Sequence, residues 1–149
     1  YRTEAVIGEA LQTLFKENVV KREELFITTK VARLIRKPED IRNSIENSLK
    51  DLQLDYIDLF LIHSPHSDNK EGTRGHDIIE MYKILNEYKA KGKIKSIGVS
   101  NFGIKHLEIL EKACPDLPVP VCNQIECTPL LQETELITFC MKKNILIES

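Results

Sequence analysis

The sequence has 149 residues and lacks any apolar stretch that approaches the roughly 20 residues of a membrane-spanning helix. Its first residues lack the charged-then-apolar pattern of a targeting segment. It has no long block of like charge, and its formal net charge is -2. We therefore expect a soluble, cytoplasmic protein that binds neither membranes nor nucleic acid.

Three other kinds of pattern are absent. None of the four cysteines forms a CxxC pair, so we expect free thiols in a reducing compartment. His63 and His66 flank a proline but are not part of a larger ligand cluster, so we expect no metal site. The sequence also lacks GxGxxG and GxxxxGK[ST], which weakens the case for an open nucleotide-binding sheet.

What is present is an alternation of helices and apolar strands. Hydrophobic periodicity predicts five helices, and five strands that begin at 25, 56, 94, 119 and 145. The segment 56–62 is so continuously apolar that it belongs to a sheet covered on both faces. Such alternation predicts one α/β domain with a parallel sheet, either a (β/α)8 barrel or an open doubly wound sheet.

Polar residues stand at the ends of these strands, where parallel α/β folds place their active sites. They are Lys30, His63, Ser100, Asn101, Asn123 and Gln124. The competing interpretation is that these residues only solubilise strand ends. On that interpretation the chain is an α/β scaffold that binds no dinucleotide.

Lys30 and His63 favour a catalytic interpretation. A lysine at the mouth of an apolar barrel lowers the pKa of a neighbouring phenol, and a histidine beside it can donate a hydrogen bond to a carbonyl. Such a site needs a proton donor, and a tyrosine serves near neutral pH only when a cation lowers its pKa of about 10. The candidates are Tyr1, Tyr56, Tyr82 and Tyr88.

Several segments, in order, resemble the aldo-keto reductase family. The most specific is 95–102, KSIGVSNF, which is similar to that family's signature strand. It is supported by FITTK at 26–30, by DYIDLFLIHSP at 55–65, and by NQIE at 123–126 followed by Pro129. The resemblance implies a (β/α)8 TIM barrel, of which this chain covers strands three to seven.

The resemblance also implies a reaction, in which a hydride passes from NADPH to the carbonyl of a small aldehyde or ketone. Tyr1 is then the general acid, Lys30 lowers its pKa and His63 orients the carbonyl. Ser100, Asn101 and Gln124 are the implied ligands of the nicotinamide amide.

The chain departs from the family pattern at both ends. The family's catalytic Asp precedes the Tyr, and its phosphate-binding loop follows the last strand seen here. We therefore expect residues 1–149 to be an incomplete barrel domain, inactive by itself, within a protein that is monomeric at full length. A non-catalytic relative that binds a dinucleotide as a regulatory subunit is the alternative, although such a subunit has no need of Tyr1, Lys30 and His63 together.

Overall fold

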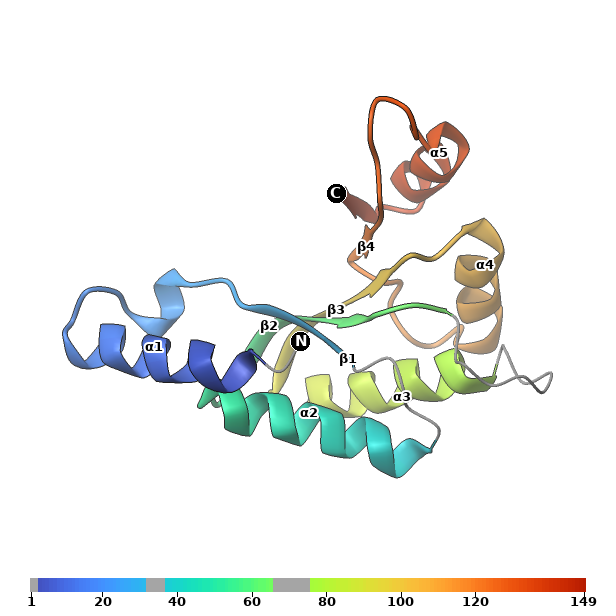
Figure 1. The fold of residues 1–149 in the computed structure, drawn as a ribbon. Coiled ribbons are helices and arrows are strands. Elements are labelled where there is room, and N and C mark those ends of the chain that lie inside the picture. The colour runs from blue at the N-terminus through green and yellow to red at the C-terminus, as the bar shows by residue number, and fades with distance from the viewer. Residues whose placement is uncertain (1–2, 32–36, 66–75) are drawn as a thin grey trace.

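A computed structural model describes residues 3–31, 37–65 and 76–149, and these form a single parallel sheet flanked by helices (Figure 1). The five strands are β1 Thr28–Val31, β2 Ile57–Ile62, β3 Ile94–Ser100, β4 Cys122–Gln124 and β5 Leu146–Glu148. The α-helices are α1 Glu4–Lys16, α2 Pro38–Leu52, α3 His76–Ala90, α4 Ile104–Ala113 and α5 Thr134–Lys142, and a 3-10 helix, η1, spans Arg22–Glu24. The alternation predicted from periodicity is confirmed.

The strand order separates the two architectures that the sequence left open. The strands lie side by side in the order β1-β2-β3-β4-β5, and each neighbouring pair is parallel. An open doubly wound sheet reverses its order at a switch point, whereas a (β/α)8 barrel adds each strand beside the previous one. The described sheet has no reversal and therefore follows the barrel order.

The first strand begins later than predicted. The sequence suggested a strand from Leu25, but Thr28 is the first residue of β1, so Lys30 lies within the strand and not after it. Side chains bind the preceding backbone instead: Arg22 Nη1 donates to Leu25 O at 2.9 Å, and Ile27 N donates to Asp58 Oδ2 at 3.0 Å. The intervening Phe26 is 68% exposed. These backbone groups are thus diverted from the sheet ladder.

The main hydrophobic core lies between the sheet and the helices. Figure 1 shows α2 and α3 together against one side of β1, β2 and β3. On β2, Phe60 and Ile62 belong to this core, whereas Leu59 and Leu61 form a second, smaller cluster with Cys122. Because successive residues of a strand face opposite sides, the sheet has one helix-covered face and one inner face.

Helix boundaries follow from local chemistry. Pro38 occupies the first turn of α2, with Glu39 and Asp40 beside the positive end of its dipole. The buried stripe that begins with Ile41 and Ile45 is the predicted one. After α3, the left-handed Gly92 has φ +74°, which confirms its predicted capping role. In the part of the chain that the structure covers, no helix is both long and apolar enough to cross a membrane.

Candidate functional site

Three of the residues predicted to bind and react lie on the inner face of the sheet. Lys30 on β1 pairs in register with Leu61 on β2, which pairs with Gly98 on β3. Two residues further along β3, Ser100 pairs with Gln124 on β4. Residues in register in a parallel sheet, and residues two apart on one strand, point to the same side. Lys30, Ser100 and Gln124 therefore belong to the face that α2 and α3 leave uncovered.

Close packing on this face depends on a glycine. A Cβ on Gly98 would lie 2.6 Å from both Leu61 Cδ2 and Cys122 Sγ. Burial, together with the smaller effect of the Glu148 charge, raises the pKa of the Cys122 thiol to about 11. The thiol therefore stays neutral and packs as a small hydrophobe, as predicted. All four cysteines are free thiols, as the sequence predicted.

Asn101 joins the carboxyl ends of three strands. Its backbone is left-handed, with φ 60°, and its N–H donates to Gln124 O at 2.9 Å. Its side-chain Nδ2 donates to His63 O just past β2 and to Ser100 Oγ at the end of β3, both at 3.1 Å. The structure thus brings His63, Ser100, Asn101 and Gln124 together, as the strand-end argument predicted.

Lys30 reaches the same edge from β1, and Glu4 fixes the start of α1 beside it. Lys30 is half-buried, and Thr29 next to it donates through Oγ1 to Glu4 Oε1 at 2.6 Å. Ser48 on α2 donates to the other carboxylate oxygen of Glu4 at 3.0 Å. The predicted general acid, Tyr1, lies outside the described residues, but Glu4 follows it by only three positions.

The other tyrosines that the sequence offered as proton donors lie elsewhere. Tyr56 precedes β2, where the guanidinium of Arg22 and the ammonium of Lys95 lie 3.9 and 3.8 Å from its ring centroid. Burial raises the pKa of Tyr82, whose hydroxyl donates to Pro118 O. Burial also raises the pKa of Tyr88, to about 12. Tyr82 and Tyr88 are therefore poor acids near neutral pH. Tyr56 lies before the start of β2, at the opposite end of the strand from His63.

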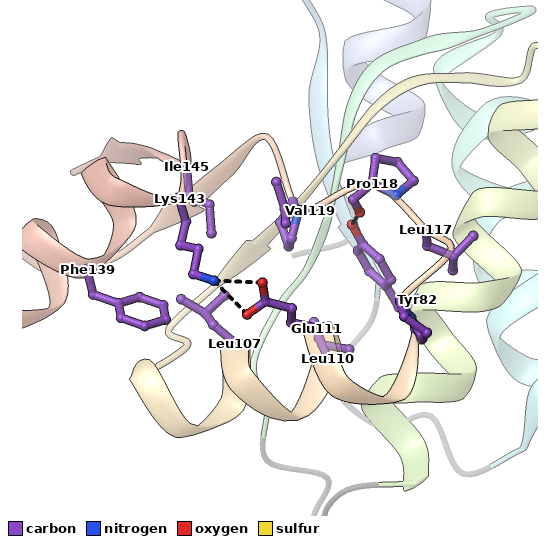
Figure 2. Close-up of a pocket in the computed structure, with 13 residues that line it drawn as sticks. Tyr82, Leu107, Leu110, Glu111, Leu117, Pro118, Val119, Phe139, Lys143 and Ile145 are labelled. Atoms are coloured by element: carbon purple, nitrogen blue, oxygen red, sulfur yellow. Dashed lines mark hydrogen bonds and ion pairs between the residues drawn. The ribbon is translucent and has the colours of Figure 1, made fainter.

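A cavity of about 130 Å³ lies away from this site (Figure 2). It sits between α4, α5 and the segment 117–120 that leads into β4. Lys143 Nζ and Glu111 form an ion pair at its rim, with N–O distances of 2.7 and 2.9 Å. Of the residues that line it, only Tyr82 was among the candidates from the sequence, and its hydroxyl is bound to Pro118 O. The cavity also adjoins the start of β4, whereas the predicted site adjoins the strand ends.

Sequence reasoning identified Asn123 as a polar residue but gave it no role. It is 0% exposed, and its Nδ2 donates to Phe102 O at 2.7 Å. Its Oδ1 accepts from Phe102 N at 3.3 Å. An asparagine inside a short apolar strand was the available signal, although its partner 21 residues away was not visible in the sequence. Glu4 was missed for the same reason, since its partners are on β1 and α2.

A metal centre has no support in residues 3–31, 37–65 and 76–149, where no three His, Cys, Asp or Glu side chains gather. The site offers instead a lysine, a histidine, a hydroxyl and two amides. Amides present both a hydrogen-bond donor and an acceptor, and can therefore pair with another amide. This set of groups can therefore hold a ligand that carries an amide or a carbonyl group.

Comparison with known proteins shows which family the chain resembles. The family model described as "Aldo/keto reductase family" matches residues 1–147. Among curated relatives, "Aldo-keto reductase family 1 member C13" of Mus musculus is 42% identical and "Aldo-keto reductase family 1 member C3" of Pongo abelii 40%. In each case the match covers 99% of this chain and 49% of the relative. The chain thus spans about half the length of these relatives.

Solved structures of aldo-keto reductases superpose on this chain. An aldo-keto reductase crystallised with NADPH superposes with a TM-score of 0.85 at 34% identity, over 97% of this chain and 44% of that one. The aldose reductase from Schistosoma japonicum gives a TM-score of 0.87 at 30% identity, over 99% and 52%. These neighbours are (β/α)8 barrels, so the described sheet is part of such a barrel.

Proposed function

The chain belongs to the aldo/keto reductase family, and from this we propose that the protein containing it reduces the carbonyl of a small aldehyde or ketone with NADPH. Residues 1–149 form part of one barrel domain. The observation that carries the proposal is the network around Asn101, which joins His63, Ser100 and Gln124 at the carboxyl ends of three strands.

Ser100, Asn101 and Gln124 hold the carboxamide of the cofactor. Ser100 and Gln124 pair across β3 and β4, and Asn101 follows immediately, so a hydroxyl and two amide side chains come from neighbouring positions at one edge of the sheet. When bound, NADPH supplies the hydride that adds to the carbonyl carbon. These three residues set which face of the nicotinamide ring is turned toward the substrate.

Tyr1, Lys30 and His63 act on the carbonyl oxygen. The phenol of Tyr1 gives its proton to that oxygen as the hydride arrives at carbon, so the product is the alcohol. The positive charge of Lys30 lowers the pKa of the phenol, because an opposite charge favours the phenolate. His63 donates a hydrogen bond that orients the carbonyl and stabilises the growing negative charge.

The proposal is tested on the full-length protein by NADPH fluorescence titration and by aldehyde-dependent loss of NADPH absorbance. Lys30→Met is expected to lower kcat by about 10²–10⁴-fold, the usual contribution of acid-base assistance, while NADPH affinity stays within a few-fold. Lys112→Met on the exposed surface of α4 is the matched control, and it is expected to change neither kcat nor the NADPH affinity.

Two outcomes would contradict the assignment in different ways. A protein that binds NADPH but reduces no aldehyde or ketone in a broad panel is the non-catalytic, dinucleotide-binding relative. A full-length protein that binds no dinucleotide is only a barrel scaffold.

A further inference from the structure

Asn123 is the only fully buried asparagine side chain among the described residues. Two of its hydrogen bonds go to the backbone of Phe102, and it also bonds with the thiol of Cys140 on α5. Its amide donates to the carbonyl of Phe102 at 2.7 Å and accepts from the N–H of Phe102 at 3.3 Å. The backbone of a neighbouring strand residue would make the same pair of hydrogen bonds, but here a side-chain amide makes them. The pairing extends the contact of β3 and β4 beyond the last register pair, Ser100 with Gln124.

The anchored segment is where the chain leaves the sheet for α4. Asn101 adopts a left-handed backbone at this point, which is rare outside glycine. Phe102 is 0% exposed and contacts the ring of His106 edge-on, with 5.8 Å between centroids. His106 Nδ1 in turn accepts from Gly103 N at 3.1 Å. The turn is therefore held from β4 on one side and from α4 on the other.

The position of Asn123 links this anchor to the proposed cofactor ligands. On β4 it directly precedes Gln124, and its partner Phe102 directly follows Asn101. A strand places neighbouring side chains on opposite faces, so Gln124 faces the site while Asn123 faces the helices. The buried Asn123 amide thus acts together with the bond from Asn101 N to Gln124 O to hold the two stretches of backbone that carry Ser100, Asn101 and Gln124.

We propose that Asn123 is a positioning residue for the nicotinamide end of the cofactor, which it serves by holding the Ser100-Asn101 turn against Gln124. This inference rests on the proposed function. Without the Asn123 amide, a buried peptide N–H and C=O lose their partners, and the turn must shift to find others. The shift misplaces the carboxamide ligands and leaves the rest of the cofactor site unaffected.

The test compares two ligands on the full-length protein. NADPH reports on the whole cofactor, whereas adenosine 2′,5′-bisphosphate lacks the nicotinamide. For Asn123→Asp and Asn123→Ser, the NADPH dissociation constant is expected to rise by about ten-fold or more, as the loss of one or two buried hydrogen bonds implies. The dissociation constant of the bisphosphate is expected to change by less than about two-fold, because no hydrogen bond to it is lost.

A pH series provides a second readout. A protonated carboxyl can donate to Phe102 O and accept from Phe102 N, as the amide does, whereas a carboxylate can only accept. The NADPH defect of Asn123→Asp, relative to the unaltered protein at each pH, should therefore shrink as the pH falls. The defect of Asn123→Ser should not change with pH.

Controls separate positioning from stability. Asn86→Asp makes the same exchange on α3, where Nδ2 of Asn86 donates to Tyr82 O, and is expected to leave both affinities unchanged. Ile45→Val destabilises the helix-facing core and should likewise leave the ratio of the two affinities unchanged. Asn123→Ser, whose side chain is small and uncharged, remains informative if the aspartate variant does not fold.

Three results would overturn the inference. One is that both ligands weaken by the same factor in the Asn123 variants, and another is that neither weakens. The third is that Ile45→Val reproduces the selective loss of NADPH binding. If the unaltered protein binds the bisphosphate but not NADPH, the proposed function fails first, and the role of Asn123 fails with it.

Discussion

Asp58, at the second position of β2, is a buried carboxylate with three partners. Its Oδ2 accepts from Arg22 Nη2 at 2.6 Å and from Ile27 N at 3.0 Å, and Lys95 Nζ lies 3.6 Å from Oδ1. Burial by itself raises the pKa of Asp58, but the Ile27 N–H and the Arg22 guanidinium outweigh it. The pKa of Asp58 is therefore held below its usual range, and the residue is charged at neutral pH.

We predict that Asp58→Ala lowers the free energy of unfolding at pH 7 by about 3 kcal/mol, because it leaves Arg22 partly buried without its partner. A depressed native pKa contributes stability above the unfolded value of about 3.9, and this contribution is lost as the pH falls through the native value. The difference in free energy of unfolding between Asp58→Ala and the unaltered protein should therefore become smaller below about pH 4. Urea unfolding of the full-length protein at several pH values measures it.

The exposed pair Arg42–Glu87 provides the contrast for this experiment. Its N–O distance is also 2.6 Å, but both side chains are about a third to a half exposed. Glu87→Ala should lower the free energy of unfolding only slightly at any pH, since solvent screens such exposed pairs. Equal losses in Asp58→Ala and Glu87→Ala would show that burial of Asp58 does not matter.

The sequence revealed the residues of the site more readily than it revealed their partners. Lys30, His63, Ser100, Asn101 and Gln124 could be singled out because they interrupt or end apolar strands. The contacts of Asp58 join residues 22, 27, 58 and 95, and those of Asn123 join two strand ends. Such pairings depend on how the strands lie in three dimensions, which periodicity along the chain does not determine.

Among the elements, α1 and α2 cross unusually closely at Gly8. A Cβ there would lie 2.1 Å from Asp51 O and 2.9 Å from the carbonyl carbon of Leu52. Gln12, one turn later, donates to Gln53 O at 2.9 Å, so α1 also bonds to the end of α2. This contact fixes where α1 lies, and therefore where Glu4 meets Thr29 on β1.

We predict that Gly8→Ala destabilises the full-length protein by about 1–3 kcal/mol, because the added methyl group meets backbone that cannot move independently. The intrinsic preference of a helix for Ala over Gly, about 1 kcal/mol, acts in the opposite direction. Thermal or urea unfolding measures the net change. Glu9→Ala, at the exposed neighbouring position, is the control, and a stabilised Gly8→Ala protein would contradict the close contact.

Element boundaries were predicted best where the chain marks them with special residues. Pro38 and Gly92 lie at or just beyond helix ends where expected. The start of β1 was predicted three residues too early, because the bonds of Arg22 and Asp58 to the backbone at 25–27 could not be seen in the sequence. Apolar character indicated that the segment is ordered, but not that side chains replace its strand pairing.

At the scale of the whole molecule, the inner face of the sheet has little cover from the residues described. Leu146 on β5 is 71% exposed, and β1 and β5 each pair on one side only within the described ranges. The curated relatives named above are about twice as long as this chain. Open sheet edges and exposed apolar faces favour association over a stable monomeric fold.

We predict that a polypeptide of residues 1–149 alone shows no NADPH-dependent carbonyl reduction and elutes as associated species from a sizing column. The full-length protein, assayed in parallel with the same aldehydes, is the control and should be active. Turnover by the purified 149-residue polypeptide would contradict this prediction.

Alternation of helices and strands was enough to predict a parallel α/β architecture for the whole molecule, but not to choose the barrel. That choice came from the strand order, which records which strands become neighbours. Two sequences with identical periodicity can differ in this respect, since the order depends on the side to which each crossover carries the chain. Beforehand, the lack of GxGxxG weakened the open-sheet alternative, and the family resemblance of 95–102 and its supporting segments favoured the barrel.

The strand order also bears on how the chain is synthesised. Within the described sheet, β2 to β5 each pair with the strand that left the ribosome immediately before, so none of these four waits for a distant partner. Pairings between segments close in sequence lose less loop-closure entropy and form sooner. Nascent chains fold from the N-terminus while synthesis continues. Successive strand-helix units can therefore join the growing sheet one at a time during translation.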